Sequence, residues 1–193
     1  MKQKNTFHPA LRIIHWLMAA AIMAMLFMGV AMVSTVSSWH SLLVAIHKPL
    51  GLMILLLVIV RLWLRFTTAK PALPATLPGW QKGLAHLSHW ALYAMMLAQP
   101  LIGWAMQSAA GYPLTLGNRV LPAIFPVSND AYALLRPLHS WVALALFMTV
   151  MLHLAAALFH GLILRDGVFS SMAGLSKRKG GAPGSLDNPH DGQ

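Results

Sequence analysis

The chain has 193 residues, of which 58% are hydrophobic and 9% are charged, with a formal net charge of +10 and no cysteine. This composition lies outside the usual range of soluble domains and predicts a membrane protein. The lack of cysteine excludes disulfides, thiolate metal ligands and iron–sulfur clusters. The positive charge brackets apolar segments instead of forming one basic face, which argues against a nucleic-acid binder.

Four apolar stretches are long enough to cross a bilayer, because about 20 residues at about 1.5 Å per residue span its hydrocarbon core. They cover residues 13–33, 42–64, 84–106 and 138–164. The first is longer than the apolar part of a signal peptide and no clear cleavage site follows it, so we interpret it as a helix. The sequence therefore predicts an all-α fold, an up-down-up-down bundle of four transmembrane helices.

The basic residues are distributed unequally between the two sides of the predicted helices, eleven against three. The first side holds Lys2, Lys4, Arg12, Arg61, Arg65, Lys70, Lys82, Arg165, Lys177, Arg178 and Lys179, and the second holds Lys48, Arg119 and Arg136. Since Lys and Arg accumulate in short cytoplasmic segments, we expect both termini in the cytoplasm of a bacterial cell, with the chain in its inner membrane.

The connections between the predicted helices differ in character. Residues 67–83 contain three prolines and form a short link between the second and third helices, which are expected to pack together. The outer loop, residues 107–137, is semi-apolar and is expected to form short pieces along the membrane surface, as a lid. Residues 1–174 are expected to form one domain, followed by a disordered cytoplasmic tail, 175–193, that is rich in Gly, Pro and charge.

Histidines are concentrated in these apolar stretches, where ionisable side chains are costly and usually have a function. His139 and His153 are 14 residues apart. They therefore face the same side of their helix, with about 21 Å of rise between them. In an antiparallel layout, His15 lies at the depth of His153, and His47 lies at the depth of His139. Two depth-matched histidine pairs are expected.

Two imidazoles can fill both axial positions of a haem iron, which leaves electron transfer as its reaction. We therefore interpret His15 with His153, and His47 with His139, as the axial ligands of two haems that are bound without covalent attachment. A single buried histidine is more often a hydrogen-bonded packing residue, but four at matched depths favour ligation. Pro49, two residues after His47, is expected either to occupy the first turn of its helix or to kink it.

Three further histidines, His86, His89 and His160, are expected near the inner pair. They are candidates for a quinone site, where they would relay the protons that quinone reduction consumes. Interfacial snorkelling, or hydrogen bonds to haem propionates, remain equally good interpretations.

The segments ALRIIHWLMAA, IHKPLGLMILLLVIVRLWLRF, GLAHLSHWALYAMMLAQPLIGWAM and LHSWVALALFMTVMLHLAAALFHG resemble the four helices of the bacterial cytochrome b561 family. The resemblance runs from about Leu11 to Gly174 and implies the same pairing of ligands on two b-type haems. Family members pass electrons between the quinone pool and other redox partners. One subgroup is similar enough to imply oxidation of superoxide at the outer face, with ubiquinone as acceptor.

The sequence thus predicts a membrane oxidoreductase that transfers electrons between a periplasmic donor, superoxide or a redox partner protein, and quinone. Lys48, Arg119 and Arg136 would attract a small anionic donor to the outer face, although Lys48 is equally well explained as an anchor at the membrane surface. An electron-relay subunit for a partner enzyme is the closest alternative. A histidine-lined metal or proton transporter, or a structural protein without cofactor, are further alternatives.

Overall fold

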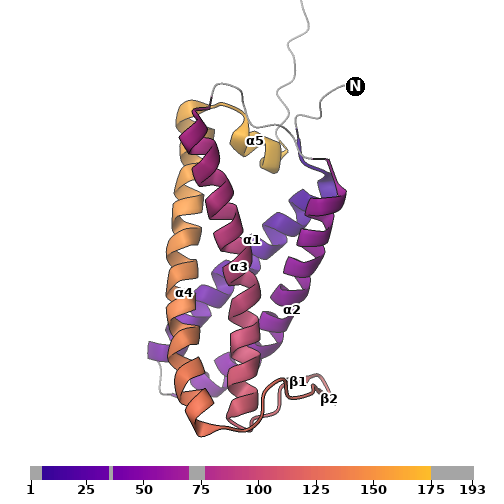
Figure 1. Ribbon diagram of the computed structural model, residues 1–193, viewed down its shortest axis with the longest axis vertical. Coiled ribbons are helices and arrows are strands. Elements are labelled where there is room, and N and C mark those ends of the chain that lie inside the picture. Colours follow the sequence, from indigo (N-terminus) through magenta and orange to yellow (C-terminus); the bar gives the residue numbers. More distant parts are fainter. Residues whose placement is uncertain (1–5, 35–36, 70–76, 175–193) are drawn as a thin grey trace, which may run out of the picture.

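A computed structural model describes residues 6–34, 37–69 and 77–174, and four long helices dominate it. The elements are α1 (Pro9–Ser34), α2 (Trp39–Thr67), α3 (Gly79–Ala109), β1 (Thr115–Leu116), β2 (Arg119–Val120), α4 (Asn129–Leu158), the π-helix η1 (Phe159–Leu164) and α5 (Val168–Ala173). The long helices run alternately in opposite directions (Figure 1). We call the end that carries α5 the α5 end and the opposite end, with β1 and β2, the hairpin end.

Three segments are long and apolar enough to cross a membrane: α1, α2 and the continuous helix Asn129–Leu164. The remaining long helix, α3, has 31 residues but carries more polar side chains, among them His86, His89 and Gln99. The prediction of a mostly helical membrane protein is confirmed. That α3 also crosses, so that all four helices form one transmembrane bundle, stays a prediction.

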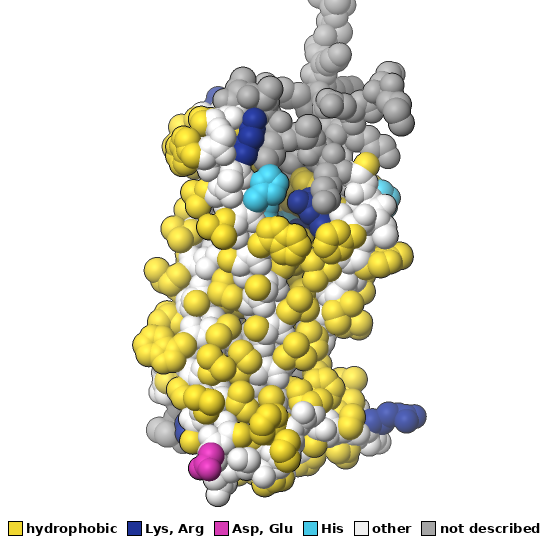
Figure 2. Space-filling view, in the orientation of Figure 1, with side chains coloured by type: hydrophobic (Ala, Val, Ile, Leu, Met, Phe, Trp, Pro, Cys, Tyr) yellow, Lys and Arg dark blue, Asp and Glu magenta, His cyan; other side chains and the backbone are white. Residues whose placement is uncertain are grey.

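The surface of the protein is apolar along most of its length. Large side chains such as Phe27, Leu56 and Leu152 are exposed, and Figure 2 shows hydrophobic groups along the length with charged groups at the two ends. Trp39, Trp63 and Trp80 are also exposed, each near a helix end. Tryptophan is enriched at membrane–water interfaces, so these three positions are typical of a protein surrounded by lipid.

A small core fills the middle of the molecule. α3 packs closely against α4, and α1 against α2, while contacts between α2 and α3 join the two pairs, as expected from the sequence. The buried side chains of the core are Met18, Ile22, Ile54, Val58, Leu92, Met96 and Leu146. Leu146 is seven residues from both His139 and His153, so this apolar layer lies between the two histidine depths.

The prediction of a long outer loop was wrong in its extent. α4 begins at Asn129, nine residues before the predicted start, so only residues 110–128 join α3 to α4. The local sequence explains the early start, because the Ser128 hydroxyl caps the helix by accepting a hydrogen bond from the amide of Ala131 (3.2 Å). Pro137, which was predicted to be the last residue of the loop, therefore lies inside α4.

Two other details also differ from the predictions. The all-α fold includes a minimal hairpin, in which Leu116 pairs with Arg119 across a two-residue turn, Gly117–Asn118. Gly117 has φ +58°, a conformation that glycine adopts without strain, and Gly–Asn is a common hairpin turn. Pro49 was predicted either to occupy the first turn of its helix or to kink it. It lies ten residues after the start of α2, so the first of these two predictions is wrong.

Some sequence-based predictions lie outside the described residues. The predicted tail, 175–193, is one of them. Others are Pro71, Pro74 and six of the basic residues that were counted for orientation: Lys2, Lys4, Lys70, Lys177, Arg178 and Lys179.

Candidate functional site

Two pairs of histidine rings meet between the long helices, one pair near each end. The ring centroids of His15 on α1 and His153 on α4 are 6.4 Å apart, with an angle of 79° between the ring planes. Those of His47 on α2 and His139 on α4 are 6.3 Å apart, with an angle of 66°. The structure thus brings together the residues that were paired by depth in the sequence.

The helices that carry paired histidines do not pack tightly on each other. α4 lies against α3 along its length, and within the described part of the chain it makes no comparable contact with α1 or α2. Each histidine pair is therefore formed across two helices whose backbones are held apart, while α3 supports α4 from another side. Such spacing suits a flat group between the rings.

The pair at the hairpin end, His47 and His139, is supported by α3; we call it the outer pair and the other the inner pair, after their predicted sides. The amide nitrogen of Gln99 donates a hydrogen bond to the backbone carbonyl of His139 (3.0 Å). One turn later, a Cβ at Gly103 would lie 3.1 Å from Cε1 of His139, closer than most such contacts. Glycine at 103 therefore lets the imidazole lie directly against the backbone of α3, and Gln99 fixes the helix segment that carries it.

The inner pair, His15 and His153, has a third ring beside it. The ring of His89 on α3 lies 5.6 Å from that of His153, also edge to face. His86, one turn before, is turned away, with Nδ1 2.7 Å from the backbone carbonyl of Lys82. Of the three predicted quinone-site histidines, His89 thus lies against the inner pair, and within the described residues no hydrogen bond or ring contact joins His86 to it.

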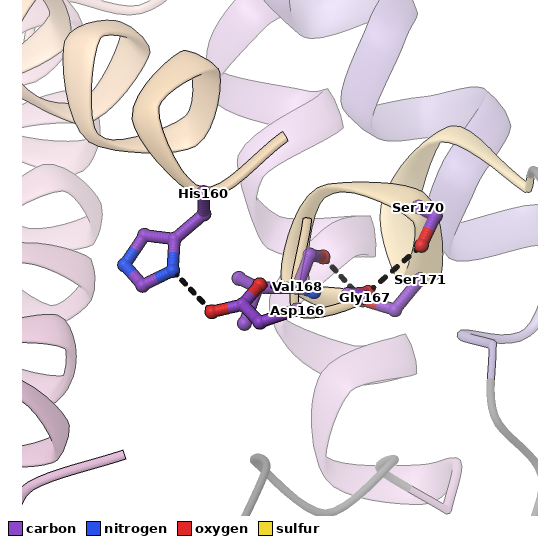
Figure 3. A network of polar contacts seen from close by, with 6 residues as sticks. All are labelled: His160, Asp166, Gly167, Val168, Ser170 and Ser171. Atoms are coloured by element: carbon purple, nitrogen blue, oxygen red, sulfur yellow. Dashed lines mark hydrogen bonds and ion pairs between the residues drawn. The ribbon is translucent and has the colours of Figure 1, made fainter. Parts of the chain in front are cut away.

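His160 lies in a different setting, in the π-helix η1. Its Nδ1 is 2.6 Å from a carboxylate oxygen of Asp166, and the two side chains are only 19% and 13% exposed (Figure 3). The other oxygen of Asp166 accepts a hydrogen bond from the amide of Val168 (3.1 Å), which fixes the carboxylate at the start of α5. Arg165 (φ +51°) and Gly167 (φ +91°) make the turn that returns Asp166 to His160.

Comparison with known proteins identifies the family. Residues 6–174 match the family model described as prokaryotic cytochrome b561. The chain belongs to this family. It is 31% identical to "Cytochrome b561 homolog 1" of Escherichia coli (strain K12) over 145 residues, which cover 74% of this chain and 80% of the relative.

Two further relatives give the same result at lower identity. "Cytochrome b561 homolog 2" of Escherichia coli (strain K12) is 27% identical over 166 residues, 84% of this chain and 88% of the relative. "Probable superoxide oxidase CybB" of Yersinia pestis is 27% identical over 135 residues, 70% of this chain and 76% of the relative. The protein is therefore a membrane cytochrome of the b561 family, which binds haem b and transfers electrons.

The histidine pairs fit the haem that this family binds. A bond from a metal to imidazole is about 2 Å long and a ring nitrogen lies about 1 Å from its centroid, so two rings on opposite sides of one ion have centroids about 6 Å apart. The observed separations of 6.4 and 6.3 Å match. The Nδ1 atoms of His47 and His139 are buried without a hydrogen-bond partner among the described residues. In the described chain, no group of three or more His, Cys, Asp or Glu side chains is arranged to hold a metal ion without haem.

Several residues near the pairs have roles that the sequence did not predict. No role was predicted for Gln99 or Gly103, because their roles depend on the packing of α3 against α4. Arg61 donates from Nε to the Tyr93 hydroxyl (3.1 Å) and from Nη1 to the carbonyl of Leu11 (3.3 Å), and so joins α2, α3 and α1 near the inner pair. A signal for Arg61 was available, since an arginine inside an apolar helix needs partners.

Proposed function

We propose that this cytochrome holds two b-type haems, one between His15 and His153 and the other between His47 and His139, within a bundle of four transmembrane helices. The observation that carries the proposal is the spacing of the two ring pairs, each of which suits two ligands on one iron. Haem iron with two imidazole ligands supplies one-electron transfer without an open position for oxygen. The chain contributes the two ligands, their separation in depth and the apolar layer between them.

We further propose that electrons enter at the hairpin end, which we place in the periplasm, from superoxide. Three basic residues lie at this end: Lys48, Arg119 and Arg136. The described chain has one acidic residue at the same end, Asp130. Their net positive charge attracts an anion to the outer pair. Two superoxide ions each lose one electron and leave as dioxygen. The relative named as a probable superoxide oxidase supports this donor.

Quinone is the proposed acceptor at the α5 end. One quinone takes up the two electrons together with two protons from the cytoplasm. His89 lies against His153 and is available to donate a hydrogen bond to a quinone carbonyl there. His160, held by Asp166, is the proposed relay for protons. His86, which is exposed and lies against the carbonyl of Lys82, has no assigned role in this site.

The haem assignment is tested by changing each histidine to alanine and counting haem in the purified protein. His15→Ala and His153→Ala should remove the same haem, and His47→Ala and His139→Ala the other, while the unmodified protein holds two per chain. His89→Ala distinguishes the roles at the inner end, because it should leave the haem content unchanged. One haem per chain, or different haems lost within a pair, would contradict the assignment.

The donor and acceptor are tested separately in the unmodified protein. Absorption of the haems is followed after mixing with superoxide and, in a second experiment, with quinol. Rapid reduction by superoxide and reoxidation by ubiquinone support the proposed direction. Reduction by quinol alone, with no reaction of superoxide, would instead favour an electron-relay subunit. That second function has one observation in its favour, the exposed apolar side chains of Tyr112, Val120 and Val127 at the hairpin end, which suit a protein partner.

A further inference from the structure

A cavity of about 300 Å³ lies at the α5 end, away from both histidine pairs. It is lined by residues 6–8, which lead into α1, by Pro9 and Arg12 in the first turns of that helix, and by Thr68 and Ala69 after the end of α2. None of the histidines proposed as haem ligands or as quinone contacts lines it. It is therefore a separate feature of the molecule.

The surroundings of the cavity are strongly basic. Arg12 lines it, and the guanidinium of Arg65 lies 5.7 Å from the ring centroid of Phe7 in its wall. Arg61 lies next to the start of α1, because its Nη1 donates a hydrogen bond to the carbonyl of Leu11. Asp166, the only acidic residue described at this end, is bonded to His160 and so leaves this charge uncompensated. The start of α1 adds the partial positive charge of a helix N-terminus.

The side chain of Arg12 uses few of its hydrogen-bond donors among the described residues. Its Nη2 donates to the carbonyl of Ala173 (3.4 Å), and its guanidinium fills the space beside Gly174, where a Cβ could not fit. Its Nε is buried and has no hydrogen-bond partner among the described residues. Because a guanidinium has five N–H donors and cannot lose its charge, Arg12 retains donors and a positive charge for an anion in the cavity.

The position of the cavity favours an anion that is attached to lipid. Directly after Arg12, the side chains of Ile13, Trp16 and Leu17 are exposed on α1 (68%, 49% and 52%), and Trp63 is exposed on α2 (64%). Further exposed apolar side chains follow toward the middle of these helices, among them Ile59 and Leu56 on α2 and Phe27 on α1. A molecule with its anionic group in the cavity can therefore lay acyl chains along α1 and α2.

We propose that this cavity binds the phosphate group of an anionic phospholipid, with Arg12 and Arg65 as its cationic partners. Basic pockets at the ends of membrane helices recognise such headgroups by charge and by hydrogen bonds to the phosphate oxygens. The bound lipid would also stabilise the contact between α1 and α5, since the same Arg12 side chain holds the carbonyl of Ala173. The inference needs only a membrane location and no particular donor or acceptor.

The proposal is tested with the complete, haem-loaded protein in a neutral detergent. The melting temperature is measured while phosphatidylglycerol, phosphatidylcholine or inorganic phosphate is added, and binding constants follow from the concentration dependence. Phosphatidylglycerol should raise the melting temperature and phosphatidylcholine should not. Inorganic phosphate acting as strongly as phosphatidylglycerol would show a phosphate site and overturn lipid as its source.

Arg65→Gln is the principal variant, because it removes one charge without breaking the bond from Arg12 to Ala173. It should weaken phosphatidylglycerol binding about tenfold, as expected for one lost charge-assisted hydrogen bond. Arg12→Gln should weaken it at least as much, provided that its haem spectrum is normal. Arg119→Gln, an exposed arginine at the hairpin end, is the matched control and should have no effect. Equal binding by all three variants would overturn the proposal.

Discussion

His139 shows how single residues on α3 control a histidine on α4. The hydrogen bond from Gln99 ends on the backbone of His139, and Gly103 leaves room for its ring one turn away. A hydrogen bond of this kind contributes about 1 kcal/mol, but an imidazole that is displaced by a few tenths of an ångström loses its alignment with a metal. We therefore regard Gln99 and Gly103 as positioning residues for the haem proposed between His47 and His139.

Gly103→Ala should disturb the outer haem alone. The new methyl group would lie 3.1 Å from Cε1 of His139, so the ring has to move away from α3. We expect an altered absorption and electron paramagnetic resonance spectrum for one of the two proposed haems, and release of that haem at a lower temperature. Gly83→Ala is the matched control on the same helix, because a Cβ there meets nothing within 4 Å. Equal spectra in both variants would contradict this role for Gly103.

At the scale of whole elements, apolar length and histidine spacing predicted the helices and the two ring pairs, because both follow from helix geometry. Three prolines limited the prediction of boundaries, since Pro49, Pro100 and Pro137 all lie inside helices. Each leaves one carbonyl without its usual donor, which membrane helices tolerate when neighbours satisfy it. Neither the π-helix η1 nor α5 was predicted, because each depends on tertiary contacts such as Phe169 against Gly161.

The π-helix η1 provides a second prediction, because it ends in the turn that joins His160 to Asp166. Asp166→Asn retains an oxygen for the amide of Val168 but removes the negative charge beside the imidazole. We expect reoxidation of the haems by ubiquinone to slow about tenfold, since the proposed proton relay loses its charged partner. Reduction by superoxide should be unchanged.

Asp130→Asn, at the opposite end, is the control for this experiment and should leave quinone reduction as it is. Unchanged reoxidation in Asp166→Asn would leave His160 and Asp166 with a structural role in fixing the end of α4. A change that appears in both variants would point to a general loss of stability.

At the scale of the whole molecule, the two ends differ in charge. Among the described residues, Arg12, Arg61, Arg65, Lys82 and Arg165 lie toward the α5 end, and Lys48, Arg119 and Arg136 lie toward the hairpin end. The positive-inside rule then predicts that the α5 end faces the cytoplasm. Reporters that are active on only one side of the membrane, fused after Gln193 and inserted at Gly117, should show a cytoplasmic C-terminus and a periplasmic hairpin. The reverse result would exchange the proposed donor and acceptor sides.

The charge at the hairpin end predicts how the reaction with superoxide depends on salt. Attraction between an anion and exposed charges falls when the Debye length shortens to about 8 Å at physiological ionic strength. Haem reduction by superoxide should therefore slow as salt is added, and also in Arg119→Gln and Arg136→Gln. Lys82→Gln, at the α5 end, should behave as the unmodified protein. A rate that responds to neither salt nor these variants would favour a protein donor.

The contribution of α4 to both histidine pairs has a consequence for how the protein is made. α4 follows α1 and α2 in the chain, so a nascent chain that ends before Asn129 contains His15 and His47 but neither of their partners. In the proposed assignment, no haem can gain its second axial bond until α4 has entered the membrane. α1 and α2 are then in the bilayer before their histidines have partners. In this assignment, both haems gain their second histidine ligand at the same late stage of biogenesis.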